Sequence, residues 1–249
     1  MVKALQFHRI TPKFQFCGTW NTPWQFKSFL QYLKDKDIPV VLPGAAQQGI
    51  IITFDDGEQS VYKNAFPLLK EYNMKALVFL IVDYIGKENV WDVSMTGTRT
   101  KHLTWDEIHE MSEWGIEFGS HTMSHRNLTH VSEKERETEL TLSRHLIEKE
   151  VGYCRSLSYP FNRINDTVVV AAQRAGFSYG FGGDGSSILQ MKKEAMYITD
   201  TTSTLCIKIN EHPGVLYWYE RSKQRVINYF TLLTMLQKRS RYFKEEVPC

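Results

Sequence analysis

GIIITFDDGEQS, residues 49–60, places two adjacent carboxylates, Asp55 and Asp56, directly after an uninterrupted run of apolar residues. The short β-branched run at residues 49–54, which gives way to helical periodicity, predicts a strand buried on both faces, as in a parallel sheet. Adjacent carboxylates repel each other, so they are an unusual choice for the end of such a strand. Asp-Gly is also common in polar turns. This stretch alone does not decide between a turn and a functional site.

Strands and helices alternate along the rest of the chain. Further strands are expected at residues 4–8, 38–42, 75–81, 116–120 and 155–159, and weaker ones at 178–181 and 196–199. Helices are expected at residues 22–36, 60–72, 104–114, 132–152, 166–174 and 222–243. Repeated strand-helix alternation with buried strands predicts parallel pairing, either in a barrel or in a doubly wound open sheet. No linker divides the chain, so we expect a single domain over residues 1–249.

The bulk composition narrows the function classes. The chain has 249 residues, and its 30 basic and 28 acidic residues leave a formal charge of +2. That balance argues against a nucleic-acid binder driven by bulk charge. No signal peptide or transmembrane segment is visible, and the four cysteines form no CxxC pair. We therefore expect a cytoplasmic protein; its oligomeric state is not indicated.

A second polar cluster, GSHTMSH at residues 119–125, also follows a predicted strand. Its two histidines, His121 and His125, are four residues apart and can reach one metal ion. A third cluster, SYPF at residues 158–161, follows the next predicted strand. Parallel α/β folds place their active sites at the carboxyl ends of strands. The three clusters are therefore predicted to form one site.

A metal explains the paired acids at residues 55 and 56. A catalytic zinc-like site needs three protein ligands and a position for water. His121, His125 and one of the two aspartates can supply the ligands. Neighbouring residues on an extended segment point in different directions, so the other aspartate can face the water and take its proton.

These motifs together resemble a known family. Residues 53–57 (TFDDG), 120–125 (SHTMSH) and 158–161 (SYPF) resemble, in order and spacing, the first three motifs of the polysaccharide deacetylases (NodB homology, carbohydrate esterase family 4). The resemblance covers about residues 5–199 and leaves 200–249 as a C-terminal extension with a final helix. It implies a distorted (β/α) barrel, similar to a TIM barrel, with about seven parallel strands.

The resemblance also implies roles for individual residues. Asp55 would be the general base, and the ligands of one divalent metal ion would be Asp56, His121 and His125. Zinc is the first choice, and cobalt, manganese or nickel suit the same ligands. Tyr159 and Pro160 would line the substrate groove, with the backbone N–H of Tyr159 helping to hold an oxyanion.

The implied reaction is hydrolysis of an N-acyl group, usually acetyl, from an amino-sugar derivative. The substrate would be a glycan, a glycolipid or a nucleotide- or lipid-linked precursor of a surface polysaccharide. A deformylase or an O-acetyl esterase would use the same site. The family's fourth motif is not readable and its fifth, Leu-x-x-His, is missing, so the general acid is unassigned between the weak candidates His212 and His8. This gap also supports an alternative from another class, a carbohydrate-binding pseudoenzyme.

Two further features have plainer interpretations. The predicted final helix is basic and amphipathic; it could lie on an anionic membrane, but we favour packing of its apolar face on the domain. The remaining histidines are expected on solvated loops or helix faces: His102, His109, His130 and His145.

Overall fold

The computed structural model describes residues 2–15, 19–88, 100–210, 218 and 222. Contacts divide the chain into two compact units, Met1–Ile198 and Thr199–Cys249. The predicted C-terminal extension, from residue 200, begins next to this boundary, whereas the single-domain assignment stays a prediction. Of the final helix predicted for residues 222–243, only residue 222 is described.

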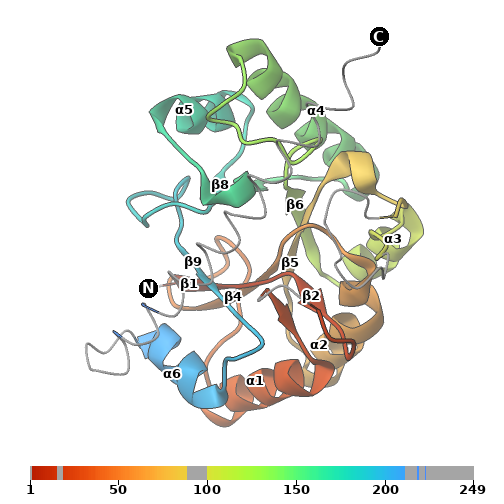
Figure 1. Cartoon of the computed structure of the whole chain (residues 1–249), viewed down its shortest axis with the longest axis vertical. Coiled ribbons are helices and arrows are strands. Elements are labelled where there is room, and N and C mark those ends of the chain that lie inside the picture. Colours follow the sequence, from red (N-terminus) through yellow and green to blue (C-terminus); the bar gives the residue numbers. More distant parts are fainter. Residues whose placement is uncertain (1, 16–18, 89–99, 211–217, 219–221, 223–249) are drawn as a thin grey trace. The chain divides into compact units, whose positions relative to one another are not determined.

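One parallel seven-stranded sheet forms the centre of the first unit, in the order β8-β7-β6-β5-β4-β1-β9 (Figure 1). Its strands are β1 (Val2–Phe7), β4 (Gly49–Phe54), β5 (Leu77–Leu80), β6 (Glu117–Ser120), β7 (Ser156–Ser158), β8 (Tyr179–Phe181) and β9 (Lys193–Ala195). The chain before β9 returns to β8, because Gly180 N–H donates to Ile188 O (2.9 Å) and Met191 N–H donates to Gly180 O (2.7 Å). These bonds bring the two edges together into a nearly closed barrel, and the predicted barrel of about seven parallel strands is confirmed.

Helices connect the strands and lie outside the sheet (Figure 1). In the first unit they are α1 (Pro23–Asp35), α2 (Phe66–Tyr72), α3 (Trp105–Glu113), α4 (Glu133–Val151) and α5 (Asp166–Arg174). Local chemistry sets their starts: Thr22 caps α1 with Pro23 at the first helical position, and Thr104 and Ser132 form capping boxes. Shorter elements are β2 (Arg9–Ile10), β3 (Trp20–Asn21), a π-turn at Val61–Ala65, and 3-10 turns at Val82–Tyr84 and Pro160–Asn162. In the second unit, α6 (Thr202–Asn210) carries a buried ion pair between Lys208 and Asp200.

Two strand predictions were wrong. Residues 38–42 form only an isolated bridge between Val40 and Ile50, because prolines at 39 and 43 lack the N–H groups that would extend a ladder. The strand predicted at 196–199 instead occupies Lys193–Ala195. Its sequence, KEA, has no apolar run to mark it, and pairing with β1 selects it. This shift places Lys193 inside the barrel.

Packed aromatic and aliphatic side chains hold the barrel together. Ala4, Ile51, Leu77, Phe79 and Phe181, from four strands, form one buried cluster. A second aromatic group joins α1 to the sheet, with ring centroids 5.2 Å apart for Phe7 and Phe26 and 5.6 Å apart for Phe7 and Phe54. Across the described part of the chain, no helix combines the length and hydrophobicity needed to cross a bilayer.

Candidate active site

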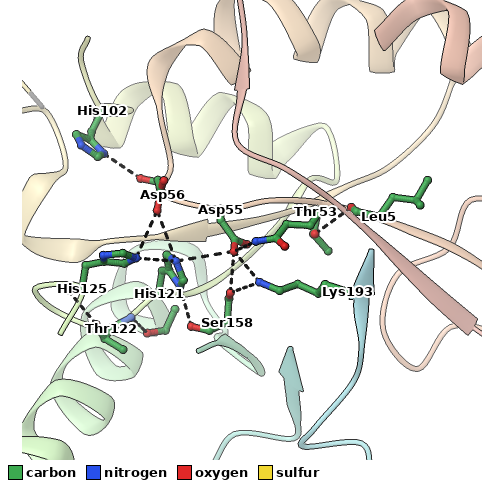
Figure 2. Close-up of polar contacts among 12 residues, drawn as sticks. Leu5, Thr53, Asp55, Asp56, His102, His121, Thr122, His125, Ser158 and Lys193 are labelled. Atoms are coloured by element: carbon green, nitrogen blue, oxygen red, sulfur yellow. Dashed lines mark hydrogen bonds and ion pairs between the residues drawn. The ribbon is translucent and has the colours of Figure 1, made fainter. Parts of the chain in front are cut away.

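The three polar clusters meet at the carboxyl ends of β4, β6 and β7, strands of one parallel sheet, as the sequence predicts. Asp55 and Asp56 follow β4, His121 follows β6, and Ser158 is the last residue of β7. Figure 2 shows their side chains converging on one small region. Since the strands are parallel and belong to one sheet, their carboxyl ends open on the same edge of the barrel.

Asp56, His121 and His125, which we call the metal triad, present three ligand atoms to one point. The Nε2 atoms of the two histidines are 3.2 Å apart, and the Asp56 Oδ1 atom lies 3.5 Å and 3.7 Å from the Nε2 atoms of His121 and His125. Tetrahedral ligands at zinc distances lie about 3.3 Å from one another. The spacing of these atoms therefore fits one small cation, and two imidazole nitrogens with one carboxylate oxygen are a donor set that zinc accepts.

The hydrogen bond of His121 sets its tautomer. Its Nδ1 atom lies 2.7 Å from the carbonyl oxygen of Ser158, and a carbonyl only accepts, so Nδ1 carries the proton. The Nε2 lone pair then points toward Asp56 and His125, an arrangement common in metal-binding histidines. Burial lowers the pKa of His121, which favours the neutral imidazole that a metal needs.

Backbone strain gathers in the same clusters. Among the described residues, seven non-glycine positions have positive φ, and five of them belong to or directly follow the three motifs: Asp56, Thr122, His125, Phe161 and Asn162. Such conformations are uncommon outside glycine and persist only where the surroundings impose them. At Asp56, with φ of 71°, one such neighbour is His102, whose Nδ1 lies 2.9 Å from the Asp56 carbonyl oxygen.

A different environment surrounds Asp55. Its Oδ2 atom accepts from the Nζ of Lys193 (2.6 Å), the Nε2 of Gln6 (2.7 Å) and the Oγ of Ser158 (3.1 Å). Lys193 also donates to the Ser158 hydroxyl at 2.7 Å. We call these four residues the base pocket. Its lysine and aspartate side chains are 1% and 2% exposed, so the ion pair is shielded from water.

The base pocket keeps Asp55 ionised and leaves one of its oxygens available. Burial by itself would raise the pKa of Asp55, but the positive charge of Lys193 holds that pKa well below its usual range. The Oδ1 atom is buried and accepts no hydrogen bond from any described residue. A buried carboxylate oxygen without a donor is costly, and it marks a place where a proton can be received.

Tyr159 and Pro160 do not lie where the sequence predicts. Tyr159 is fully buried; its hydroxyl donates to Leu189 O (2.9 Å) and its N–H donates to Phe181 O (2.9 Å). That N–H continues the pairing of β7 with β8, so it does not face a substrate, and Pro160 is buried as well. The geometry does not support the oxyanion role that the resemblance implies for Tyr159.

Phe161 is the residue of the third motif that reaches the metal triad. Its φ of 60° reverses the chain inside the Pro160–Asn162 turn, and its ring centroid lies 4.5 Å from that of His125, edge to face. No sequence signal points to this position, because an aromatic residue after a strand more often packs in a core.

The sequence also missed Lys193, and it misjudged His102. Lys193 lies 138 positions from Asp55, and its strand was predicted three residues too late. Its ammonium group lies 5.9 Å from the ring centroid of Phe79 in the barrel core. His102, predicted to be solvated, is 2% exposed, because its backbone pairs with Glu58.

The two candidates for the general acid have different outcomes. His8 directly follows β1 beside the base pocket, and its buried Nδ1 has no hydrogen-bond partner among the described residues. Burial lowers the pKa of His8 to about 4, with Lys193 and His121 acting in the same direction and Asp55 opposing them. The imidazole is therefore neutral at pH 7. His212 lies outside the described residues.

Comparisons with known proteins point to one family. Residues 44–180 match the family model described as polysaccharide deacetylase. A poly-β-1,6-N-acetyl-D-glucosamine N-deacetylase of Staphylococcus epidermidis is 29% identical over 177 residues, which cover 64% of this chain and 60% of that protein. The chain spans about half to three fifths of the length of the curated relatives it matches.

Solved structures show the same fold. The Streptococcus pyogenes deacetylase PplD, in complex with acetate, superposes with a TM-score of 0.72 at 23% identity, covering 85% of this chain and 98% of that one. IcaB from Ammonifex degensii superposes with a TM-score of 0.67 at 22% identity, covering 83% of this chain and 95% of that one.

Proposed function

This chain belongs to the polysaccharide deacetylase family, and on that premise we propose that it is a metal-dependent hydrolase that removes an N-acyl group, usually acetyl, from an amino-sugar derivative. The observation that carries the proposal is the pairing of two sites. A buried carboxylate, held ionised and with one oxygen available, lies next to three ligand atoms spaced for one cation. Amide hydrolysis needs both, since water must lose a proton while negative charge develops on the carbonyl oxygen.

The metal triad would hold one divalent cation, with zinc as the first choice and cobalt, manganese or nickel as substitutes. A bound ion would supply Lewis-acid chemistry that polarises the amide carbonyl and makes water easier to deprotonate. The chain's own contribution is to hold His121 in the tautomer that leaves Nε2 free and to aim that nitrogen with the Ser158 carbonyl.

Asp55 takes the proton from the attacking water. Lys193, Gln6 and Ser158 occupy its Oδ2 atom and so fix the carboxylate plane. The remaining oxygen, Oδ1, is then the proton acceptor. Because its pKa lies well below neutral, Asp55 is fully ionised at pH 7 and ready to accept. A positioned base of this kind contributes about 10²–10⁴-fold to the rate.

The substrate class follows from the names of the relatives. The Staphylococcus relatives are named for deacetylation of poly-β-1,6-N-acetyl-D-glucosamine, and we propose an N-acetylated amino sugar for this chain too. The sugar would be presented as a glycan, a glycolipid or a nucleotide- or lipid-linked precursor. The same constellation suits a formyl group or an O-acetyl ester, so the acyl group has to be tested directly.

Release of acetate or formate from defined substrates tests the proposal. Protein freed of metal by a chelator and then reloaded with Zn²⁺, Co²⁺, Mn²⁺ or Ni²⁺ is incubated with N-acetylglucosamine oligomers, UDP-N-acetylglucosamine, N-formyl analogues and an O-acetyl ester. We expect acetate from an N-acetyl substrate with metal and none after chelation. Full metal occupancy without release from any of these substrates would contradict the proposal and support the carbohydrate-binding pseudoenzyme, which the missing fifth motif also favours.

A further inference from the structure

The loop that carries the two histidines of the metal triad is strained. Between His121 and His125 the chain adopts positive φ at Thr122 (70°) and again at His125 (61°). For a β-branched residue such as threonine this region is a genuine outlier. Such conformations persist only where the surroundings impose them, so contacts from neighbouring elements are expected to hold the loop.

Helix α4 forms hydrogen bonds with this loop through the carboxylate of Glu139. One oxygen of that carboxylate accepts the backbone N–H of Ser124 at 2.9 Å, and the other accepts the Ser124 hydroxyl. Ser124 directly precedes His125 in the chain. Glu139 is 8% exposed, so these charge-assisted bonds are shielded from water and stronger than bonds between neutral groups.

One turn further along α4, Ser143 holds the start of the loop. Its hydroxyl donates to the carbonyl oxygen of Glu139 at 2.7 Å, and a hydroxyl has one proton to give. The Ser120 hydroxyl, 2.7 Å away, must then donate to Ser143 and accept from the N–H of Thr122 (2.9 Å). The hydrogen-bond chain has one direction and ends on the backbone of α4.

The strained residues are thereby linked to each other. The Thr122 hydroxyl accepts the N–H of His125 at 3.1 Å (Figure 2). On another side of the loop, backbone groups contribute: Val82 N–H donates to Thr122 O (3.3 Å) and Asp83 N–H donates to Met123 O (2.9 Å). The side chain of α4 that bonds the loop backbone directly is that of Glu139.

We propose that Glu139 and Ser143 are positioning residues for the metal centre: by clamping Ser124 and Ser120 to α4, they hold the backbone that aims His121 and His125 at one cation. This inference rests on the metal site of the proposed function. It concerns this chain's affinity for metal and does not depend on turnover. Residues that orient metal ligands in this way typically change metal affinity by about 10- to 100-fold when removed.

Metal affinity measured by competition with a fluorescent zinc chelator, at fixed pH, tests the clamp. Glu139→Ala should weaken zinc binding by about 10- to 100-fold, and Glu139→Gln, which keeps one acceptor oxygen for Ser124, should lose less. Glu137→Ala is the matched control, since it removes an exposed glutamate from the same helix. Leu140→Ala, at a fully buried position of α4, should lower the melting temperature of the metal-free protein without changing the zinc affinity of the folded protein.

Wild-type zinc affinity in Glu139→Ala would overturn the inference, as would an equal loss of affinity in Leu140→Ala. If Glu139→Ala does not fold, Ser124→Ala and Ser143→Ala remove single bonds of the same clamp; unchanged affinity in both would overturn it too. Acetate release is measured separately on the wild-type protein. If the wild type releases acetate and Glu139→Ala keeps its zinc affinity, this inference alone is wrong. If Glu139→Ala binds zinc more weakly but the wild type releases no acetate, the proposed activity alone is wrong. A wild type that binds no zinc contradicts both.

Discussion

Asp55 and Asp56 are neighbours in the chain, yet the structure places their carboxylates in two opposite environments. Asp55 directly follows strand β4 and is buried in the base pocket against Lys193. Asp56, at a positive φ, turns its carboxylate toward the two imidazoles of the metal triad, and its side chain is 16% exposed. Two residues with the same side chain thus differ in charge partner, burial and direction. Surroundings of this kind, rather than residue type, separate a base from a ligand.

Exchanging each aspartate for asparagine is the strongest way to test this comparison. Asp56→Asn removes a charged ligand and should reduce both metal content and activity. Asp55→Asn should lower kcat by about 10²–10⁴-fold while the metal content stays near wild type. Elemental analysis and acetate release on the same preparations give both values. An Asp55→Asn variant with full activity, or one that loses its metal, would show that the two roles are not divided as we propose.

Removing the positive charge of Lys193 tests what keeps Asp55 ionised. The folded-state pKa of Asp55 is depressed, so its contribution to stability is present above the ordinary carboxyl pKa and is lost only as pH falls through the lower folded value. Lys193→Met leaves a buried carboxylate without its cation, which should cost about 3–5 kcal/mol of the free energy of unfolding. The pKa of Asp55 should rise, and the acid limb of the kcat/KM profile should move to higher pH.

Urea denaturation and a pH-rate profile measure these two effects of Lys193→Met. Lys192→Met is the control, since the adjacent lysine is one-third exposed and pairs with Glu194 instead. An unchanged acid limb together with wild-type stability would mean that Lys193 does not set the charge state of Asp55.

His8 should give the smallest effect, confined to acidic pH. Its pKa is about 4 in the folded protein against an ordinary 6.5, so the unfolded chain binds more protons between these values and stability falls as pH drops through that window. For metal-free protein we expect a loss of about 2 kcal/mol between pH 7 and pH 5. His8→Asn should remove most of this loss, as urea denaturation at the two pH values would reveal. Equal pH dependence in both proteins would mean that burial does not lower the pKa of His8 as we expect.

Local sequence patterns predicted many of the helices and strands, and particular elements show why. The strand Gly49–Phe54 and the helix Asp166–Arg174 have the predicted bounds, because a β-branched apolar run and a capped amphipathic run are decided within their own residues. Thr22, Thr104 and Ser132 cap helices for the same local reason. Where pairing rather than propensity selects a strand, as at Lys193–Ala195, the pattern failed.

The candidate site was predictable only in part. The spacing of the two histidines and the paired aspartates are sequence features, and their positions after strands predicted that they would meet. It was not predictable that Phe161, rather than Tyr159, would lie beside the metal triad. This placement depends on a backbone reversal at Phe161, and the N–H of Tyr159 is used in the pairing of β7 with β8.

By itself, the sequence determined the alternation of most strands and helices, the family and which four polar residues would come together, because short-range periodicity and motif spacing are properties of neighbouring positions. Only the tertiary structure decided which cation neutralises Asp55 and which residues form hydrogen bonds with the loop between His121 and His125. Lys193 and Glu139 reach their partners across 138 and 15 positions of chain. Closure of the barrel brings Lys193 to Asp55, and packing of α4 brings Glu139 to Ser124. A local sequence pattern does not indicate contacts between positions so far apart in the chain.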